Sequence, residues 1–91
     1  MSMRPSTTEA EIWSRAIRPD IGDMSPDAAR EFLRLKISDS DAARVHELST
    51  QANAGTLSPE EEQELDHYLS VGRTLEFIKA KARLSLRDAA A

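Results

Sequence analysis

The stretch that decides the fold is residues 58–87, SPEEEQELDHYLSVGRTLEFIKAKARLSLR. Ser58 and Pro59 are typical of the first positions of a helix, and no further proline or other decisive stop occurs before about Arg87. Such a helix has about 29 residues and, at about 1.5 Å rise per residue, is about 43 Å long. A compact domain of this chain length has a radius of gyration of only about 12 Å, so the helix predicts a partner surface beyond its own domain.

The residues before this stretch predict an antiparallel helical hairpin. Val45 and Leu48 have helical spacing in a preceding helix, and Gly55 is suited to end that helix in the left-handed conformation. Ser58 and Glu61 have the spacing of a capping box at the start of the long helix. Because the connection is so short, the two helices are expected to fold back on each other.

Two shorter helices are predicted further upstream. The first begins near Thr8, with Glu11 three residues on, and is ended by Pro19. The second begins at Ser25, with Pro26 at its first position. The apolar residues expected to face the core are Ile12, Trp13, Ala16 and Ile17 in the first helix and Ala29, Phe32 and Leu33 in the second.

Length and composition bound the fold class. The chain has 91 residues, of which 40% are hydrophobic, and its Gly 3 and Pro 4 predict few turns and long elements. Almost no stretch has the alternation of a strand. We therefore expect an all-α fold, in which two short N-terminal helices pack on a long C-terminal helical hairpin. Residues 1–7 are predicted to form a flexible tail and residues 8–91 a single helical domain.

The absence of cysteine excludes disulfides, thiolate metal sites and cysteine nucleophiles, and fits a reducing compartment. No stretch approaches the roughly 18 apolar residues of a membrane span, and the N-terminus lacks the apolar core of a signal peptide. We therefore expect a cytoplasmic protein that does not contact membranes.

Charge is distributed unevenly along the chain. The formal net charge is −4, yet residues 37–72 carry −7 and residues 73–91 carry +3, while residues 1–36 balance. This division predicts head-to-tail electrostatic pairing, or separate acidic and basic contact surfaces. A solvated helix that places acids at its positive end and bases at its negative end accounts for the same pattern.

The apolar residues of the long helix form two edges, which implies two neighbours. One edge has the three-four spacing of a coiled-coil seam and comprises Tyr68, Val71, Leu75, Ile78 and Ala82. The other comprises Leu65, Leu69 and Gly72. Gly72 indicates a kink or break, a close approach of another helix, or a tolerated exposed glycine.

Little in the sequence points to catalysis or metal binding. The two histidines, His46 and His67, and the scattered carboxylates match no metal-ligand spacing, so no metal or other cofactor is expected. The calcium-loop resemblance of residues 39–41 fails because Arg44 occupies the position that requires glycine. No glycine-rich phosphate loop or nucleophile elbow is present, and we expect no enzyme activity.

Residues 42–87 resemble a family of short, uncharacterised bacterial all-helical proteins. The stretches that carry the resemblance are Gly55-Thr56-Leu57-Ser58-Pro59-Glu60-Glu61 and Lys81-Ala82-Arg83. Genes of that family lie beside small HNH-type nuclease genes, so the resemblance implies a partner or antitoxin-like role. Ala80 departs from the family pattern, which has a polar residue there, and residues 1–41 lie outside the resemblance.

We expect a non-enzymatic protein-interaction module that forms homo-oligomers or docks on a protein partner. The interface is predicted at Tyr68, Val71, Leu75 and Ile78, with Lys79, Lys81 and Arg83 setting the orientation. The same residues are equally suited to an intramolecular core and a solvated face. The alternative is a nucleic-acid-binding accessory protein that uses this basic end, although Phe77 is its only aromatic residue and the domain is acidic.

Overall fold

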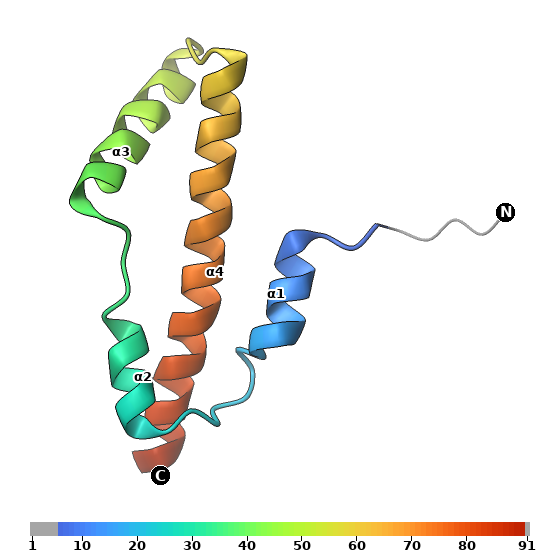
Figure 1. The fold of residues 1–91 in the computed structure, drawn as a ribbon, viewed down its shortest axis with the longest axis vertical. Helices are drawn as coiled ribbons and strands as arrows, with labels where there is room; N and C mark the ends of the chain where they lie inside the picture. The colour runs from blue at the N-terminus through green and yellow to red at the C-terminus, as the bar shows by residue number, and fades with distance from the viewer. Residues whose placement is uncertain (1–5, 91) are drawn as a thin grey trace, which may run out of the picture.

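The computed structural model describes residues 6–90, which form four helices and no strand (Figure 1). The all-α prediction is therefore confirmed for this part of the chain. Most of the predicted tail, residues 1–5, and the last residue lie outside the described residues. The helices are α1 (Glu9–Ile17), α2 (Pro26–Leu33), α3 (Asp39–Ala54) and α4 (Pro59–Ala90).

Helix α4 has 32 residues and begins at a complete capping box. The backbone N–H of Glu61 donates to the Ser58 hydroxyl at 3.1 Å, and the Glu61 carboxylate accepts from the Ser58 N–H at 3.0 Å. The helix continues through Gly72, which excludes a break, one of the alternatives that the sequence left open at this glycine. A Cβ atom at Gly72 would meet no atom within 4 Å, so the close approach that this glycine permits is not made within the chain.

All three short helices pack on α4 rather than on one another. Helices α2 and α3 follow each other along one side of α4 and run antiparallel to it, while α1 lies on the other side (Figure 1). Residues 34–38 join α2 to α3. We call α2, this linker and α3 together the α2–α3 arm, which bows away from α4 at the linker. The molecule is only 16 Å thick along its shortest axis, little more than one helix diameter of about 10–12 Å. The helices therefore form a single layer.

The predicted helix ends are present. Thr8 accepts a hydrogen bond from the Glu11 N–H at 3.1 Å, which caps α1, and Arg18 ends this helix with φ 56° directly before Pro19. Gly55 ends α3 with φ 72°, and the Thr56 N–H donates to the Gln51 carbonyl at 2.9 Å. Local sequence signals thus decide where these helices start and stop.

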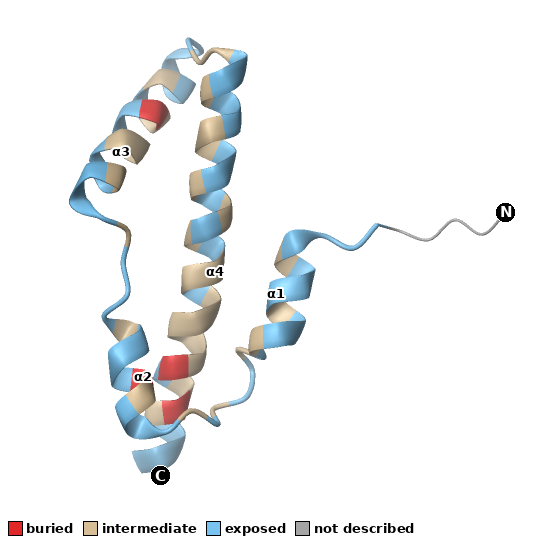
Figure 2. Cartoon of the chain, viewed as in Figure 1, coloured by how far each residue is buried: buried red, intermediate tan, exposed pale blue. Residues whose placement is uncertain are grey.

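The core is small and lies at two places along α4. Ala29 of α2 and Ala82 of α4 are 0% exposed at one end, and Leu48 of α3 is 0% exposed at the other (Figure 2). Phe32, which was expected in the core, is 38% exposed. A single layer of helices encloses little volume, so few side chains reach complete burial.

The predicted apolar face of α1 is wrong for three of its four residues. Ile12 and Trp13 are 50% and 40% exposed, and Ala16 is also exposed. The half-buried residues of the helix are Ala10, Ser14 and Ile17. Because α1 packs on α4 alone, one narrow line of contact suffices, and Ile12 and Trp13 fall outside it.

Candidate protein-docking surface

The C-terminal part of α4 is fastened to the segment between α1 and α2. The Lys81 ammonium lies 2.6 Å from the Asp23 carboxylate and donates to the Arg18 carbonyl at 3.3 Å. Its side chain is only 12% exposed. The hydrogen bond from Lys81 lowers the pKa of Asp23 below its usual range. Lys81, predicted as a contact for a partner or for nucleic acid, therefore serves the fold.

Two further contacts hold the same segment on α4. The Ser85 hydroxyl, 1% exposed, accepts from the Met24 N–H at 3.1 Å and donates to the Lys81 carbonyl at 2.7 Å. A Cβ atom at Gly22 would lie 2.9 Å from the Leu84 carbonyl carbon, closer than carbon atoms pack. The sequence predicted only a turn around Gly22, since nothing local indicates what the turn packs against.

The N-terminal part of α4 is joined to α3 by an ionic cluster. The Arg44 guanidinium binds both Glu64 oxygens, at 2.8 and 2.7 Å, and donates to Glu47 at 2.8 Å, while Glu61 lies 3.7 Å away. These contacts raise the pKa of Arg44, and the Arg44 hydrogen bond lowers the pKa of Glu64. This cluster was not predicted from the sequence. The sequence contains one indication of it, since Arg44 is the single Lys or Arg residue of residues 37–72, which also contain eight Asp and Glu residues.

Tyr68 also connects α4 to α3. Its hydroxyl donates to the Asp41 carboxylate at 2.7 Å, and Asp41 accepts a second hydrogen bond from the Ser38 hydroxyl at 2.9 Å. The bond from Tyr68 lowers the pKa of Asp41, and the carboxylate raises the pKa of Tyr68. The ring of Tyr68 is consequently held in one position.

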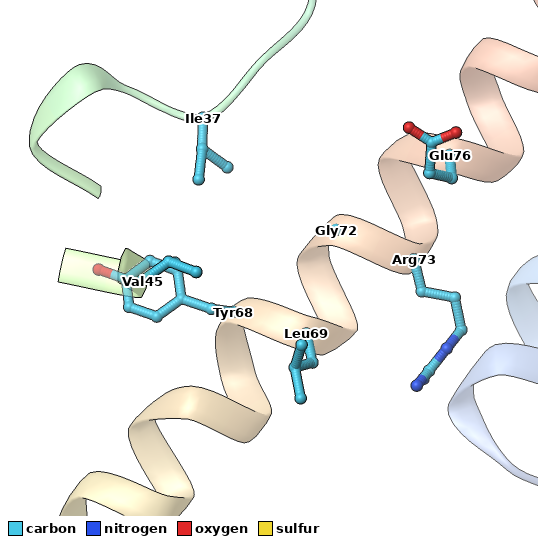
Figure 3. Close-up of a pocket in the computed structure, with 7 residues that line it drawn as sticks. All are labelled: Ile37, Val45, Tyr68, Leu69, Gly72, Arg73 and Glu76. Carbon is cyan, nitrogen blue, oxygen red and sulfur yellow. The ribbon is translucent and has the colours of Figure 1, made fainter. Parts of the chain in front are cut away.

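Between these two fastened ends lies an apolar groove of about 610 Å³ (Figure 3). It is open where the α2–α3 arm bows away from α4, with Ile37 from the linker on one side and Tyr68 reaching toward Val45 of α3. Its lining on α4 continues through Leu69 and Gly72. The charged residues of the groove are Arg73 and Glu76.

The middle of α4 exposes two large apolar side chains, on different faces of the helix. Leu69 is 53% exposed and borders the groove, while Val71 is 50% exposed. Two residues of the α2–α3 arm, Phe32 and Leu35, are 38% and 42% exposed. Of these four residues only Leu69 lines the groove, and an exposed apolar residue at a groove is typical of a docking surface.

The predicted interface residues are divided between this surface and the interior. Tyr68 lines the groove, whereas Val71, Leu75 and Ile78 lie on the helix face that carries Ala82, where Val71 is exposed and the other two are half-buried. The remaining two cations differ from Lys81: Lys79 is half-buried, and Arg83 is exposed and lies 3.5 Å from Glu76. The groove residues of α4 that were not selected from the sequence are Leu69, Gly72, Arg73 and Glu76. Leu69 and Gly72 belong to the second apolar edge of the long helix, and that edge could have indicated them.

Within residues 6–90 no group of three or more His, Asp and Glu residues is placed to hold a metal ion. His46 and His67 are exposed. No helix in this part of the chain is long and apolar enough to cross a bilayer. Family models, curated proteins and solved structures were all compared with the chain, and none matches.

Proposed function

We propose that this protein is a non-enzymatic protein-interaction module that binds a protein partner through the middle of α4. The observation that carries this proposal is the groove beside exposed Leu69. It lies between the part of α4 on which α3 packs and the part on which α2 packs. A domain ordinarily buries its apolar faces between two layers of secondary structure. This single layer leaves those faces for another molecule.

The lining of the groove supports a partner that presents apolar side chains. Tyr68 is suited to be an anchor because its hydroxyl is already bound to Asp41, so little side-chain freedom is lost on binding. Arg73 and Glu76 at the groove favour a partner that carries both signs of charge. Lys79 and Arg83, further along α4, extend the row of charges that Arg73 and Glu76 begin, in the orienting role predicted for them.

The test is a tagged pull-down from native lysate, divided into nuclease-treated and untreated halves. Leu69→Glu is compared with Ile12→Glu, which places the same charge at a residue of similar exposure, 50% against 53%, on α1. We expect one protein, identified by mass spectrometry, to be captured in near-equal amount by the parent and by Ile12→Glu. Leu69→Glu should capture at least tenfold less, since it places a charge in the apolar contact.

Capture that is equal for all three proteins contradicts docking at the groove. Material lost after nuclease treatment would move the function to nucleic acid and to the cations near the end of α4. A small nuclease as the captured protein would extend the family resemblance to an antitoxin-like role, and an unchanged cleavage rate of that nuclease would remove that role.

A further inference from the structure

One face of α4 carries an exposed stripe of residues at alternating spacings of four and three, the spacing of a coiled-coil seam. Every member is exposed except Ala80, which is half-buried. We call this the outer stripe. Its members are Glu62, Asp66, Leu69, Arg73, Glu76, Ala80, Arg83 and Arg87.

The outer stripe is self-complementary in charge. Its midpoint falls between Thr74 and Leu75, and every charge on one side of this midpoint has an opposite charge at the same distance on the other side. The two uncharged members are also equidistant from the midpoint. The pairs are Glu62 with Arg87, Asp66 with Arg83, Leu69 with Ala80, and Arg73 with Glu76.

We propose that the partner of this surface is a second copy of the same chain, with the two α4 helices antiparallel about a two-fold axis at the midpoint of the outer stripe. This inference rests on the proposed function and names its partner. A two-fold axis places each residue of a pair opposite the other residue in the second copy, so all three charge pairs form twice. A parallel arrangement would instead place Glu62 against Glu62 and Arg83 against Arg83.

The helix dipole accounts for only part of this charge order. Its effect is confined to the first and last turns of a helix, and the four charges nearest the midpoint lie well inside α4. Within one chain these charges are only weakly engaged, since Arg83 and Glu76 lie 3.5 Å apart and are 56% and 71% exposed. They are therefore free to exchange this contact for one across the interface.

The fold leaves space for the second copy. Helix α1 lies on one side of α4 and the α2–α3 arm lies on the other, so neither covers the outer stripe (Figure 1). Leu69 belongs both to the outer stripe and to the groove, so pairing would also shield apolar surface. Only Leu69 and Ala80 supply apolar contact along the stripe itself. The association is accordingly weak and falls as salt screens the charges.

Sedimentation equilibrium of the full chain over a range of concentrations, at low and high salt, tests the proposal. Glu62→Arg with Asp66→Arg makes the outer stripe nearly all positive, and Arg83→Glu with Arg87→Glu makes it nearly all negative. We expect the parent to form a dimer, and each double variant to associate at least tenfold more weakly. Glu60→Arg, which changes an exposed acid outside the stripe, should leave the dimer intact.

The combination of all four substitutions decides the register. Antiparallel pairing predicts that the quadruple variant dimerises again, because every reversed charge meets a reversed partner. If that variant does not fold, as judged by circular dichroism, an equimolar mixture of the two double variants should associate more tightly than either alone, which tests the charge pairing of the stripe but not its direction. The parent remaining monomeric, or double variants that dimerise as well as the parent, would overturn the proposal.

The outcome also separates this inference from the proposed function. A monomeric parent that still captures a different protein in a manner sensitive to Leu69→Glu overturns self-pairing and leaves the interaction module standing. A monomeric parent that captures nothing removes both.

Discussion

The two ends of α4 are held by different kinds of contact. At the C-terminal end α2 packs closely, Ala82 and Ser85 are buried, and Lys81 fastens the segment from Arg18 to Met24. At the N-terminal end α3 is held by one buried leucine and by polar contacts such as the ionic cluster of Arg44. Lys81 is thus part of an internal joint, although Arg83 and Arg87 of the same end stay exposed, and the groove lies in the middle, where the α2–α3 arm bows away.

The largest effect is expected at the N-terminal end of α4, where α3 contributes a single fully buried apolar side chain. Leu48→Ala should lower the free energy of unfolding by about 2–5 kcal/mol, because it empties the only fully buried apolar position of α3. Urea denaturation followed by circular dichroism measures the change. Leu69→Ala is the matched control and should have little effect, since Leu69 is 53% exposed. Equal losses for the two variants would contradict the contrast between joint and open surface.

A smaller loss is expected at the joint of the C-terminal end. Gly22→Ala should lower the free energy of unfolding by about 1–3 kcal/mol, because its Cβ would lie 2.9 Å from the backbone of Leu84 and force the segment off α4. Thermal denaturation gives this number. An unchanged midpoint temperature of unfolding would mean that the segment around Gly22 does not pack closely on α4.

The same substitution in the open middle should have the opposite sign. Gly72→Ala is expected to raise the free energy of unfolding by about 1 kcal/mol, because alanine favours the helix and the new methyl meets no atom within 4 Å. Urea denaturation alongside Gly22→Ala makes the comparison direct. A loss of stability at Gly72 would show that another element covers this part of α4.

The smallest effect concerns pH. The pKa of Asp41, Glu64 and Asp23 is lowered in the folded chain, by hydrogen bonds from Tyr68, Arg44 and Lys81 respectively. Carboxyls with a lowered pKa stabilise the fold above their unfolded value of about 4, and this contribution is lost as pH falls through their folded values. We therefore expect unfolding in urea to become easier below about pH 4.

Tyr68 acts in the opposite direction because its pKa is raised in the folded chain. Its contribution is present below the unfolded value of about 10 and is lost as pH rises further. Asp41→Asn removes the charge that raises this pKa, so the alkaline loss should shrink in that variant. The chemical denaturation midpoint, measured from acid to alkaline pH, checks both limbs, and a loss that is unchanged in Asp41→Asn would contradict the assignment.

The sequence predicted what local chemistry determines. Ser58 with Glu61, Thr8, and Gly55 mark helix ends through bonds to residues within a few positions, so the elements and the hairpin follow from the sequence. The contacts of Lys81 and Gly22 could not be predicted from the sequence because their partners lie about 60 residues away. A basic residue on a helix looks the same in sequence whether it faces solvent or a distant carboxylate.

For the docking surface, too, the sequence predicted what depends on local spacing and not what depends on distant packing. The two apolar edges of α4 were visible in the helical spacing, including Leu69 and Gly72. Which edge stays open depends on where the α2–α3 arm bows, and no pattern within α4 encodes that. The stripe Ile12, Trp13 and Ala16 was assigned to the core for a similar reason, since the helix spacing does not say that α1 has a single neighbour.

Thiol labelling of single-cysteine variants reports directly on whether the middle of α4 is open in the single chain and covered by a partner. The chain has no cysteine of its own, so only the introduced thiol reacts. Leu69→Cys and Ala82→Cys are compared in dilute protein, in concentrated protein and in native lysate. We expect fast labelling at position 69 when the protein is dilute, slower labelling once a second copy or another protein is present, and slow labelling at position 82 throughout. Position 69 labelling as slowly as position 82 in dilute protein, or equally fast under all three conditions, would contradict this expectation.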